Sequence, residues 1–110
     1  QNSHKERVNN VNLKLNAVLV AVYFANEHGS NGLEIEASNG VFTGDGKWKC
    51  KQVNDESDIP GWNLPNFNDD DWLDATLNSN SSEEPFEYAK SIWANGGPVS
   101  KGYCRRWLWI

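Results

Sequence analysis

Residues 45 to 74 read DGKWKCKQVNDESDIPGWNLPNFNDDDWLD, and they hold three of the chain's six tryptophans and one of its two cysteines. Turn-forming Asp, Asn, Gly and Pro residues separate the aromatic positions, and no helical apolar periodicity runs through the segment. A buried tryptophan covers a large apolar area and needs a partner for its indole N–H. The segment therefore predicts an ordered, loop-rich part of a β-domain, rather than a helix or a disordered linker.

The whole chain has the length of one domain and a modest apolar content. Of its 110 residues, 38% are hydrophobic and 12% are aromatic, and its formal net charge is -5. A chain of this size and composition predicts a small core, built from a few strands and the aromatic residues. The acidic balance argues against nucleic acid as a partner, because phosphate binding requires a clustered basic face. The apolar run from Ala17 to Ala25 is about half as long as a membrane span, so none is expected.

Short apolar runs between turn signals predict an all-β fold. Asn39-Gly40 and Asp45-Gly46 stand between such runs and are typical of hairpin turns. Strands at this spacing indicate a sandwich or barrel rather than alternating strands and helices. We expect a polar N-terminal arm at residues 1–11 and a single β-sandwich domain at 12–110. The predicted strands are residues 13–24, 33–37, 41–43, 47–53, 75–77, 86–93 and 103–110.

Two local features of the predicted domain concern charged and polar residues. Asn68 to Trp72 predicts one helical turn, in which Asn68 caps and the following aspartates face the N-terminal dipole. Basic residues gather at Lys47, Lys49 and Lys51 and again at Arg105-Arg106. Alternate residues of a strand share one face, so both basic clusters are expected on a solvated outer face.

Cys50 and Cys104 are the chain's two cysteines. They make a poor zinc site, because His4 and His28 lie far from them along the chain. Neither cysteine belongs to a C-x-x-C pair. We favour a disulfide over free thiols, since a loop of this length would stabilise a weak core by roughly 4 kcal/mol. A disulfide forms in an oxidising compartment. The sequon at Asn80 is a glycosylation signal, and the two together predict a secreted glycoprotein.

An ordered series of aromatic and cysteine motifs runs through the chain. Its members are Trp48-Lys49-Cys50, Gly61-Trp62, Phe67 to Trp72 followed by Ala75, Ile92-Trp93 and Tyr103-Cys104-Arg105. Over residues 12–108 the series resembles the C-terminal two-thirds of a galactose-binding-domain-like jelly roll of secreted invertebrate and protist proteins. A similar string occurs in sugar-binding β-sandwich domains of several glycoside hydrolases. The resemblance implies a jelly-roll β-sandwich in which most of the tryptophans, Trp48, Trp72 and Trp93 among them, belong to the core.

Three departures from that pattern stand out. Asp71 occupies the place of a serine, and Ala94 replaces one tryptophan of a usual pair. The strands that normally open the family's domain are missing ahead of Leu13. An eight-stranded jelly roll would then keep an unpaired edge. We expect strands of another chain or of a cleaved N-terminal piece to complete the sheet; the alternative is a smaller, complete sandwich of about seven strands.

The polar residues do not assemble an obvious catalytic centre. His4 lies in the polar arm and His28 in a glycine-rich turn, and neither has a nucleophile setting; the loop carboxylates lack the apolar pocket that a glycosidase acid requires. The chain is therefore expected not to be an enzyme. Asp69, Asp70 and Asp71 offer hard oxygen ligands and form a candidate calcium site, with capping of the helical turn as the alternative explanation.

A sugar needs an exposed aromatic face with polar side chains around it. Trp62 follows Pro-Gly in a loop and is the candidate platform, with Asn63, Asn66 and Asn95 as polar partners. The alternative is that Trp62 covers the small core. Trp107 and Trp109 share one face of the last predicted strand and are candidate contacts with another subunit, with a place in the core as the alternative.

These features lead to three hypotheses for function. The first is a secreted, lectin-like recognition or adhesion module whose partner is a glycan or glycoprotein. The second is a structural subunit, a homo-oligomer or part of a larger extracellular assembly, that docks through an edge strand and the terminal tryptophans. The third is an accessory domain of a glycoside hydrolase.

Overall fold

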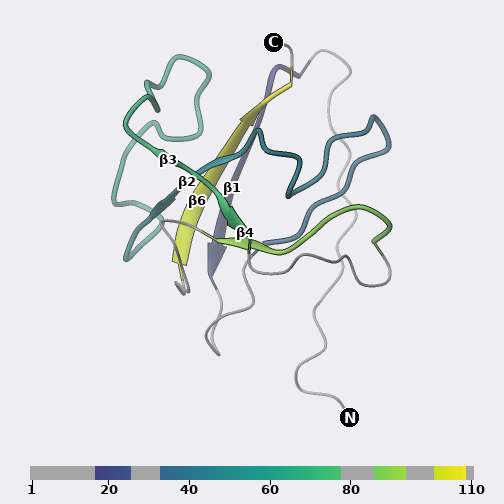
Figure 1. Cartoon of the computed structure of the whole chain (residues 1–110). Helices are drawn as coiled ribbons and strands as arrows, with labels where there is room; N and C mark the ends of the chain where they lie inside the picture. Colours follow the sequence, from purple (N-terminus) through teal and green to yellow (C-terminus); the bar gives the residue numbers. More distant parts are fainter. Residues whose placement is uncertain (1–16, 26–32, 78–85, 94–100, 109–110) are drawn as a thin grey trace.

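The computed structural model describes residues 17–25, 33–77, 86–93 and 101–108 (Figure 1). Six strands lie in these ranges: β1 (Leu19–Ala25), β2 (Lys49–Gln52), β3 (Leu73–Asp74), β4 (Thr76–Leu77), β5 (Ile92–Trp93) and β6 (Lys101–Trp107). All of their pairings are antiparallel. The described residues form no helix, and so none that has the length and hydropathy of a membrane span. The prediction of an all-β, sandwich-like fold is confirmed.

The C-terminal strand lies inside the main sheet. Four strands follow one another in the order β1-β6-β2-β3, and β4 and β5 form a separate pair. β1 and β6 pair along their full length, from Leu19 opposite Trp107 to Ala25 opposite Lys101, and they run side by side in Figure 1. β2 pairs with the other edge of β6. β6 therefore unites segments that are far apart in the sequence.

Several predicted strands prove shorter than expected. Residues 33–37 and 41–43 meet as a hairpin through the turn at Gly40, which has a φ of 92°, with Ala37 N–H donating to Val41 C=O at 2.8 Å. Only isolated bridges form there, Glu36 with Phe42 and Leu33 with β5. Of residues 86–93, only Ile92–Trp93 is a strand. Residues 1–16, with the predicted arm, and 109–110 lie outside the described ranges.

The predicted helical turn at Asn68 to Trp72 is a hydrogen-bonded turn rather than a helix. Trp72 N–H donates to Asp69 C=O at 3.0 Å, which closes the turn. Asn68 Oδ1 accepts the Asp70 N–H at 2.9 Å, so Asn68 bonds the start of this turn, although no helix follows it. One turn of chain is enough to send Trp72 inward, where it is 7% exposed.

Both faces of the main sheet are covered. Because side chains alternate along a strand, Cys104 and Arg106 of β6 point to one face, and Tyr103 and Arg105 to the other. We name the first the disulfide face and the second the loop face. The buried core of the disulfide face consists of Val20, Phe24, Val41, Trp48, Cys50, Ile92 and Cys104. That of the loop face consists of Val53, Trp62, Trp72 and Tyr103.

The predicted disulfide is present. Cys50 of β2 lies opposite Cys104 of β6, and their sulfur atoms are 2.04 Å apart. Both residues are almost fully buried, with 1% and 0% of their surface exposed. The bond therefore joins two neighbouring strands inside the core of the disulfide face.

Gly102 is a position at which a side chain does not fit. A Cβ placed there would lie 2.8 Å from the Phe24 ring and 2.9 Å from the Lys51 carbonyl oxygen. We expect Gly102→Ala to lower the free energy of unfolding by about 1–3 kcal/mol, because β1 or β2 must shift to make room. Urea denaturation measures this loss. Gln52→Ala, on the exposed residue opposite Gly102, is the control and is expected to stay within about 0.5 kcal/mol of wild type. Equal effects of the two substitutions would contradict the steric explanation.

Candidate functional site

Arg105 organises the loop that covers the loop face. Its guanidinium is buried; Nε donates to Asp69 Oδ2 at 2.8 Å, and Nη1 donates to the Trp62 and Leu64 carbonyls, the latter at 3.0 Å. Nη2 donates to the Phe67 carbonyl at 3.4 Å. An arginine is suited to this role, because its planar fork offers several donors in fixed directions. One side chain of β6 thus holds the loop from Trp62 to Asp69 in place.

Tyr103, two residues earlier on β6, supports the start of the same loop. Its hydroxyl donates to the Glu56 carbonyl at 2.6 Å and accepts the Ile59 N–H at 3.2 Å. Its ring lies nearly parallel to the rings of Trp62 and Trp72, with centroids 4.1 Å and 5.9 Å away. Trp62 and Trp72 therefore pack on a tyrosine that β6 supplies, whereas Trp48 of the same segment packs on the disulfide face.

This packing decides the surroundings of Trp62. The residue is 8% exposed and one ring face lies against Tyr103, so Trp62 belongs to the core, as the alternative interpretation predicted. It is not an open aromatic platform. Trp48 and Trp72 are also buried, which confirms their predicted core positions. Trp93 is half-buried.

An open groove of about 510 Å³ lies where Trp62 reaches the surface. Its lining combines polar and apolar side chains. Its lining residues are Asp55, Glu56, Ser57, Ile59, Pro60, Gly61, Trp62 and Asn63. Of the predicted sugar-binding residues, Trp62 and Asn63 thus meet at one site. Asn66 is exposed but does not line the groove. Asn95, like the glycosylation candidate Asn80, lies outside the described residues.

The groove has a negative electrostatic character. The hydroxyl and the backbone N–H of Ser57 donate to the Asp55 carboxylate, and these bonds lower the pKa of that group. Burial raises the pKa of the nearby Tyr23 hydroxyl, and the carboxylates of Asp55 and Glu56 raise it further. Asp55 therefore stays ionised and hydrogen-bonded at neutral pH, and can accept a bond from a ligand hydroxyl only through its remaining lone pairs.

The calcium prediction does not match the geometry. Asp69 is 7% exposed and its carboxylate contacts the guanidinium of Arg105, which already supplies the positive charge. Asp70 and Asp71 are exposed. In the described ranges, no three His, Cys, Asp or Glu side chains form a group that could hold a metal ion. The acidic run serves the turn and the buried ion pair instead.

The terminal arginines correct another expectation. Lys47 and Lys51 are exposed as predicted. Arg105 and Arg106 are buried instead, with 1% and 7% of their surface exposed. Arg106 faces the disulfide face, where its Nε lies 2.9 Å from Asp45 Oδ2. Adjacent residues of a strand point to opposite faces, so two consecutive arginines in a strand covered on both sides need one acid in each covering loop. The rule applies to these arginines only because β6 lies inside the sheet, a position that the sequence analysis did not predict.

Trp107 lies on the same face as Arg105. It is half-buried, and the Arg105 guanidinium is 5.6 Å from the centroid of its ring. This contact is a cation–π arrangement within the chain. The predicted role of Trp107 at an interface stays a prediction, and its companion Trp109 lies outside the described residues.

Glu36 holds the segment that precedes β5. Its carboxylate accepts the backbone N–H groups of Glu87, Tyr88 and Ala89 at 3.1, 2.6 and 2.8 Å. These bonds, led by the one from Tyr88, lower the pKa of Glu36 below its usual value of 4.5. A side chain thus replaces the ladder that was predicted for residues 86–91, which explains why β5 is short.

Glu36 makes the free energy of unfolding depend on pH in the acidic range. A lowered pKa means that its contribution is fully present above about pH 5 and is lost as the pH falls through the native pKa. We expect the urea midpoint of the wild type to fall as the pH is lowered through the native pKa of Glu36. Glu36→Gln should lower the midpoint at pH 7 and remove part of its dependence on pH. Asp71→Asn, at an exposed acidic residue in another loop, is the control. Parallel pH profiles for Glu36→Gln and the wild type would contradict this role.

Comparison with protein-family models, with curated proteins and with solved structures returned no match to this chain. The likeness to galactose-binding-like jelly rolls therefore stays a resemblance of motifs. Function has to be inferred from the groove beside Trp62 and from the contacts that hold it.

Proposed function

We propose that this protein is a non-enzymatic, secreted recognition module that binds carbohydrate in the groove beside Trp62. The observation that carries the proposal is the meeting of Trp62 and Asn63 with the polar residues 55–57 around one open groove. Apolar surface for sugar C–H groups and polar groups for sugar hydroxyls are the two elements of such a site. The apolar surface comes from Ile59, Pro60 and the exposed part of Trp62.

The groove is held in shape before any ligand arrives. The Tyr103 hydroxyl bonds the backbone of Glu56 and Ile59, and Arg105 donates to the Trp62 and Leu64 carbonyls. A preorganised loop loses little conformational entropy on binding, which favours recognition of a weakly binding ligand such as a sugar. Arg105 and Tyr103 are positioning residues in this proposal, because they act through the loop.

A glycan array followed by titration calorimetry tests the proposal. We expect binding to one class of glycan, and a loss of at least tenfold in affinity for Asn63→Ala and for Glu56→Gln, two exposed residues of the groove. Asn66→Ala is the matched control, since this asparagine belongs to the same loop but lies outside the groove. Trp62→Ala is unsuitable because it removes a core residue. Absence of glycan binding, or an equal loss in Asn66→Ala, would reject the proposal.

A second candidate function is that of a subunit in an extracellular assembly. β1 ends the four-stranded sheet, and in the described part of the chain only β6 pairs with it. Val18, just before this strand, is 40% exposed. We propose in this case a jelly roll completed along β1 by a strand of another chain or of a cleaved N-terminal piece. Light scattering would show a stable oligomer that Val18→Lys weakens; a monomer at high concentration would reject this candidate.

A further inference from the structure

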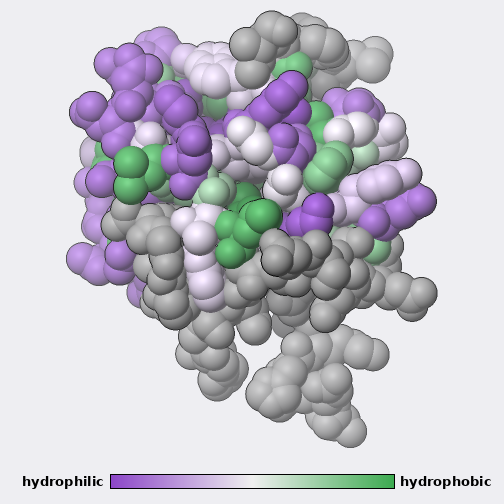
Figure 2. Space-filling model, viewed as in Figure 1, coloured by the Kyte–Doolittle hydropathy of each residue, from purple (hydrophilic) through white to green (hydrophobic). Residues whose placement is uncertain are grey.

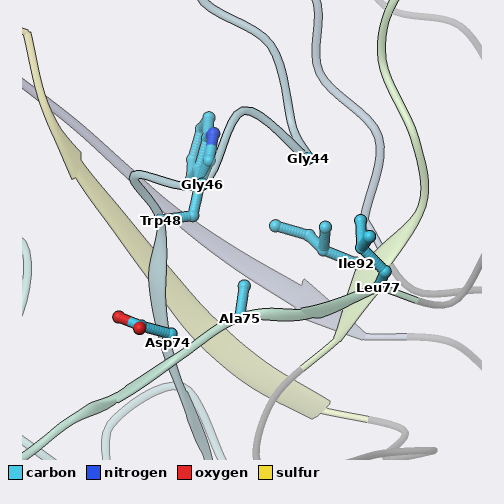
Figure 3. Close-up of a pocket in the computed structure, with 7 residues that line it drawn as sticks. All are labelled: Gly44, Gly46, Trp48, Asp74, Ala75, Leu77 and Ile92. Carbon is cyan, nitrogen blue, oxygen red and sulfur yellow. The ribbon is translucent and has the colours of Figure 1, made fainter.

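A second, smaller cavity lies on the disulfide face, away from the groove beside Trp62. It measures about 270 Å³, and its lining residues come from the turn before β2, from β3 and β4, and from β5. They are Gly44, Gly46, Trp48, Asp74, Ala75, Leu77 and Ile92 (Figure 3). Figure 2 shows apolar residues gathered on the molecular surface over β4, which carries Leu77. None of its described lining residues belongs to the groove beside Trp62.

The walls of the cavity are uncharged where they face one another. In Figure 3 the side chain of Ile92 points across the space toward the indole of Trp48, and the Asp74 carboxylate points away from Ile92 and Leu77. Gly44 and Gly46 contribute only backbone, and a Cβ at Gly46 would meet no atom within 4 Å. Among the described residues, the lining apart from Asp74 therefore consists of an aromatic ring, aliphatic groups and glycine.

The cavity cannot close by a simple movement of its walls. The Trp48 indole N–H donates to the Phe42 carbonyl at 2.9 Å, and the Ala75 N–H donates to the Trp48 carbonyl at 2.9 Å. Ile92 exchanges two backbone hydrogen bonds with Leu33, at 2.8 and 3.0 Å. Movement of these backbone segments toward one another would break such bonds, so the backbone and the Trp48 ring around the space are fixed before a ligand binds.

From these observations we infer that the cavity binds one small, uncharged apolar molecule, with about one aromatic ring or a short alkyl chain. A dry apolar cavity of about 150 Å³ accepts benzene, so a space of this larger size has room for a substituted ring. Water is a poor occupant because it needs two to four polar partners. A charged ligand is disfavoured, because Asp74 is the one charged residue among the described lining residues and its carboxylate points away from Ile92 and Leu77. This inference is independent of carbohydrate binding on the opposite face.

Titration of the native protein with 4-fluorotoluene, followed by fluorine NMR, tests the inference. We expect one saturable site. In proton–nitrogen spectra the indole N–H signal of Trp48 should shift, whereas that of Trp62, on the other face of the sheet, should not. Absence of saturable binding, or saturable binding that leaves the Trp48 signal unmoved, would overturn the inference.

Variants that fill or narrow the cavity give the matching test. Ala75→Leu is expected to weaken binding at least tenfold, and its fold is checked by circular dichroism. Leu77→Phe narrows the mouth at a 46% exposed position, where the larger ring is tolerated, and is expected to weaken binding similarly. Ala25→Leu, at the exposed end of β1, is the control and should bind as the wild type does. Unchanged binding in a folded Ala75→Leu or Leu77→Phe protein would also overturn the inference.

Discussion

Replacement of Arg105 by methionine is expected to lower the free energy of unfolding by about 3–5 kcal/mol. The substitution keeps much of the apolar stem but leaves the carboxylate of Asp69, which is 7% exposed, without its partner. It also leaves the Trp62 and Leu64 carbonyls without their donor. A buried ion that loses its partner keeps its full desolvation cost, which is why one side chain has so large an effect. Urea denaturation at pH 7 measures the loss.

Two further variants separate the charge of Arg105 from its shape. Arg105→Lys keeps the charge but loses the planar fork, so most of the destabilisation should remain. The double variant Arg105→Met with Asp69→Leu removes both charges and should be more stable than Arg105→Met alone. A loss below about 1 kcal/mol in Arg105→Met, within the range of exposed ion pairs, would show that this arginine is solvated after all.

Removal of the disulfide is expected to cost roughly 4 kcal/mol, because the bond closes a loop across a sequence separation of 54 residues. The double variant Cys50→Ala with Cys104→Ala measures this cost in urea denaturation without reductant. The two sulfur positions lie in the core of the disulfide face, so loss of packing adds to the loss of the constraint on the unfolded chain.

The native bond should also resist reduction. Cys50 and Cys104 are 1% and 0% exposed, so dithiothreitol can reach them only when the protein opens. We expect reduction to become fast only at urea concentrations that unfold the protein, and mass spectrometry after alkylation measures its rate. Reductant added to the double alanine variant is the control and should change nothing. Rapid reduction in the absence of urea would contradict the buried position of the bond.

The identities and approximate places of the long strands followed from local pattern. The apolar run that became β1, the alternation in β2 and the aromatic run of β6 each carry a signal that neighbouring residues provide. The disulfide followed from cysteine count and chain length. The short strands β3 to β5 were less well predicted, since two-residue pairings depend on what lies opposite them. Glu36, which holds residues 87–89 by three N–H groups, carries no such local signal.

The candidate sites were predicted only in part, and Asp69 shows why. An aspartate in an acidic turn is a reasonable calcium ligand or cap by sequence alone. Its partner Arg105 lies 36 residues away and meets it only because β6 enters the middle of the sheet. The same applies to Trp62: a tryptophan after Pro-Gly suits a sugar platform, but the position of Tyr103 turns it into core. The cavity beside Trp48 joins three segments and has no counterpart in any single stretch of sequence.

The amino-acid sequence by itself determined an antiparallel β-fold with buried tryptophans and one disulfide, because these depend on local periodicity, turn chemistry and cysteine content. Only the tertiary structure decided that the C-terminal strand is central, that its two arginines reach opposite faces, and that each of them finds an aspartate there. The physical reason is the cost of burying charge. A guanidinium is buried at low cost only where a carboxylate pairs with it. Here the carboxylates come from residues distant in the sequence, so the ion pairs form only in the assembled sheet.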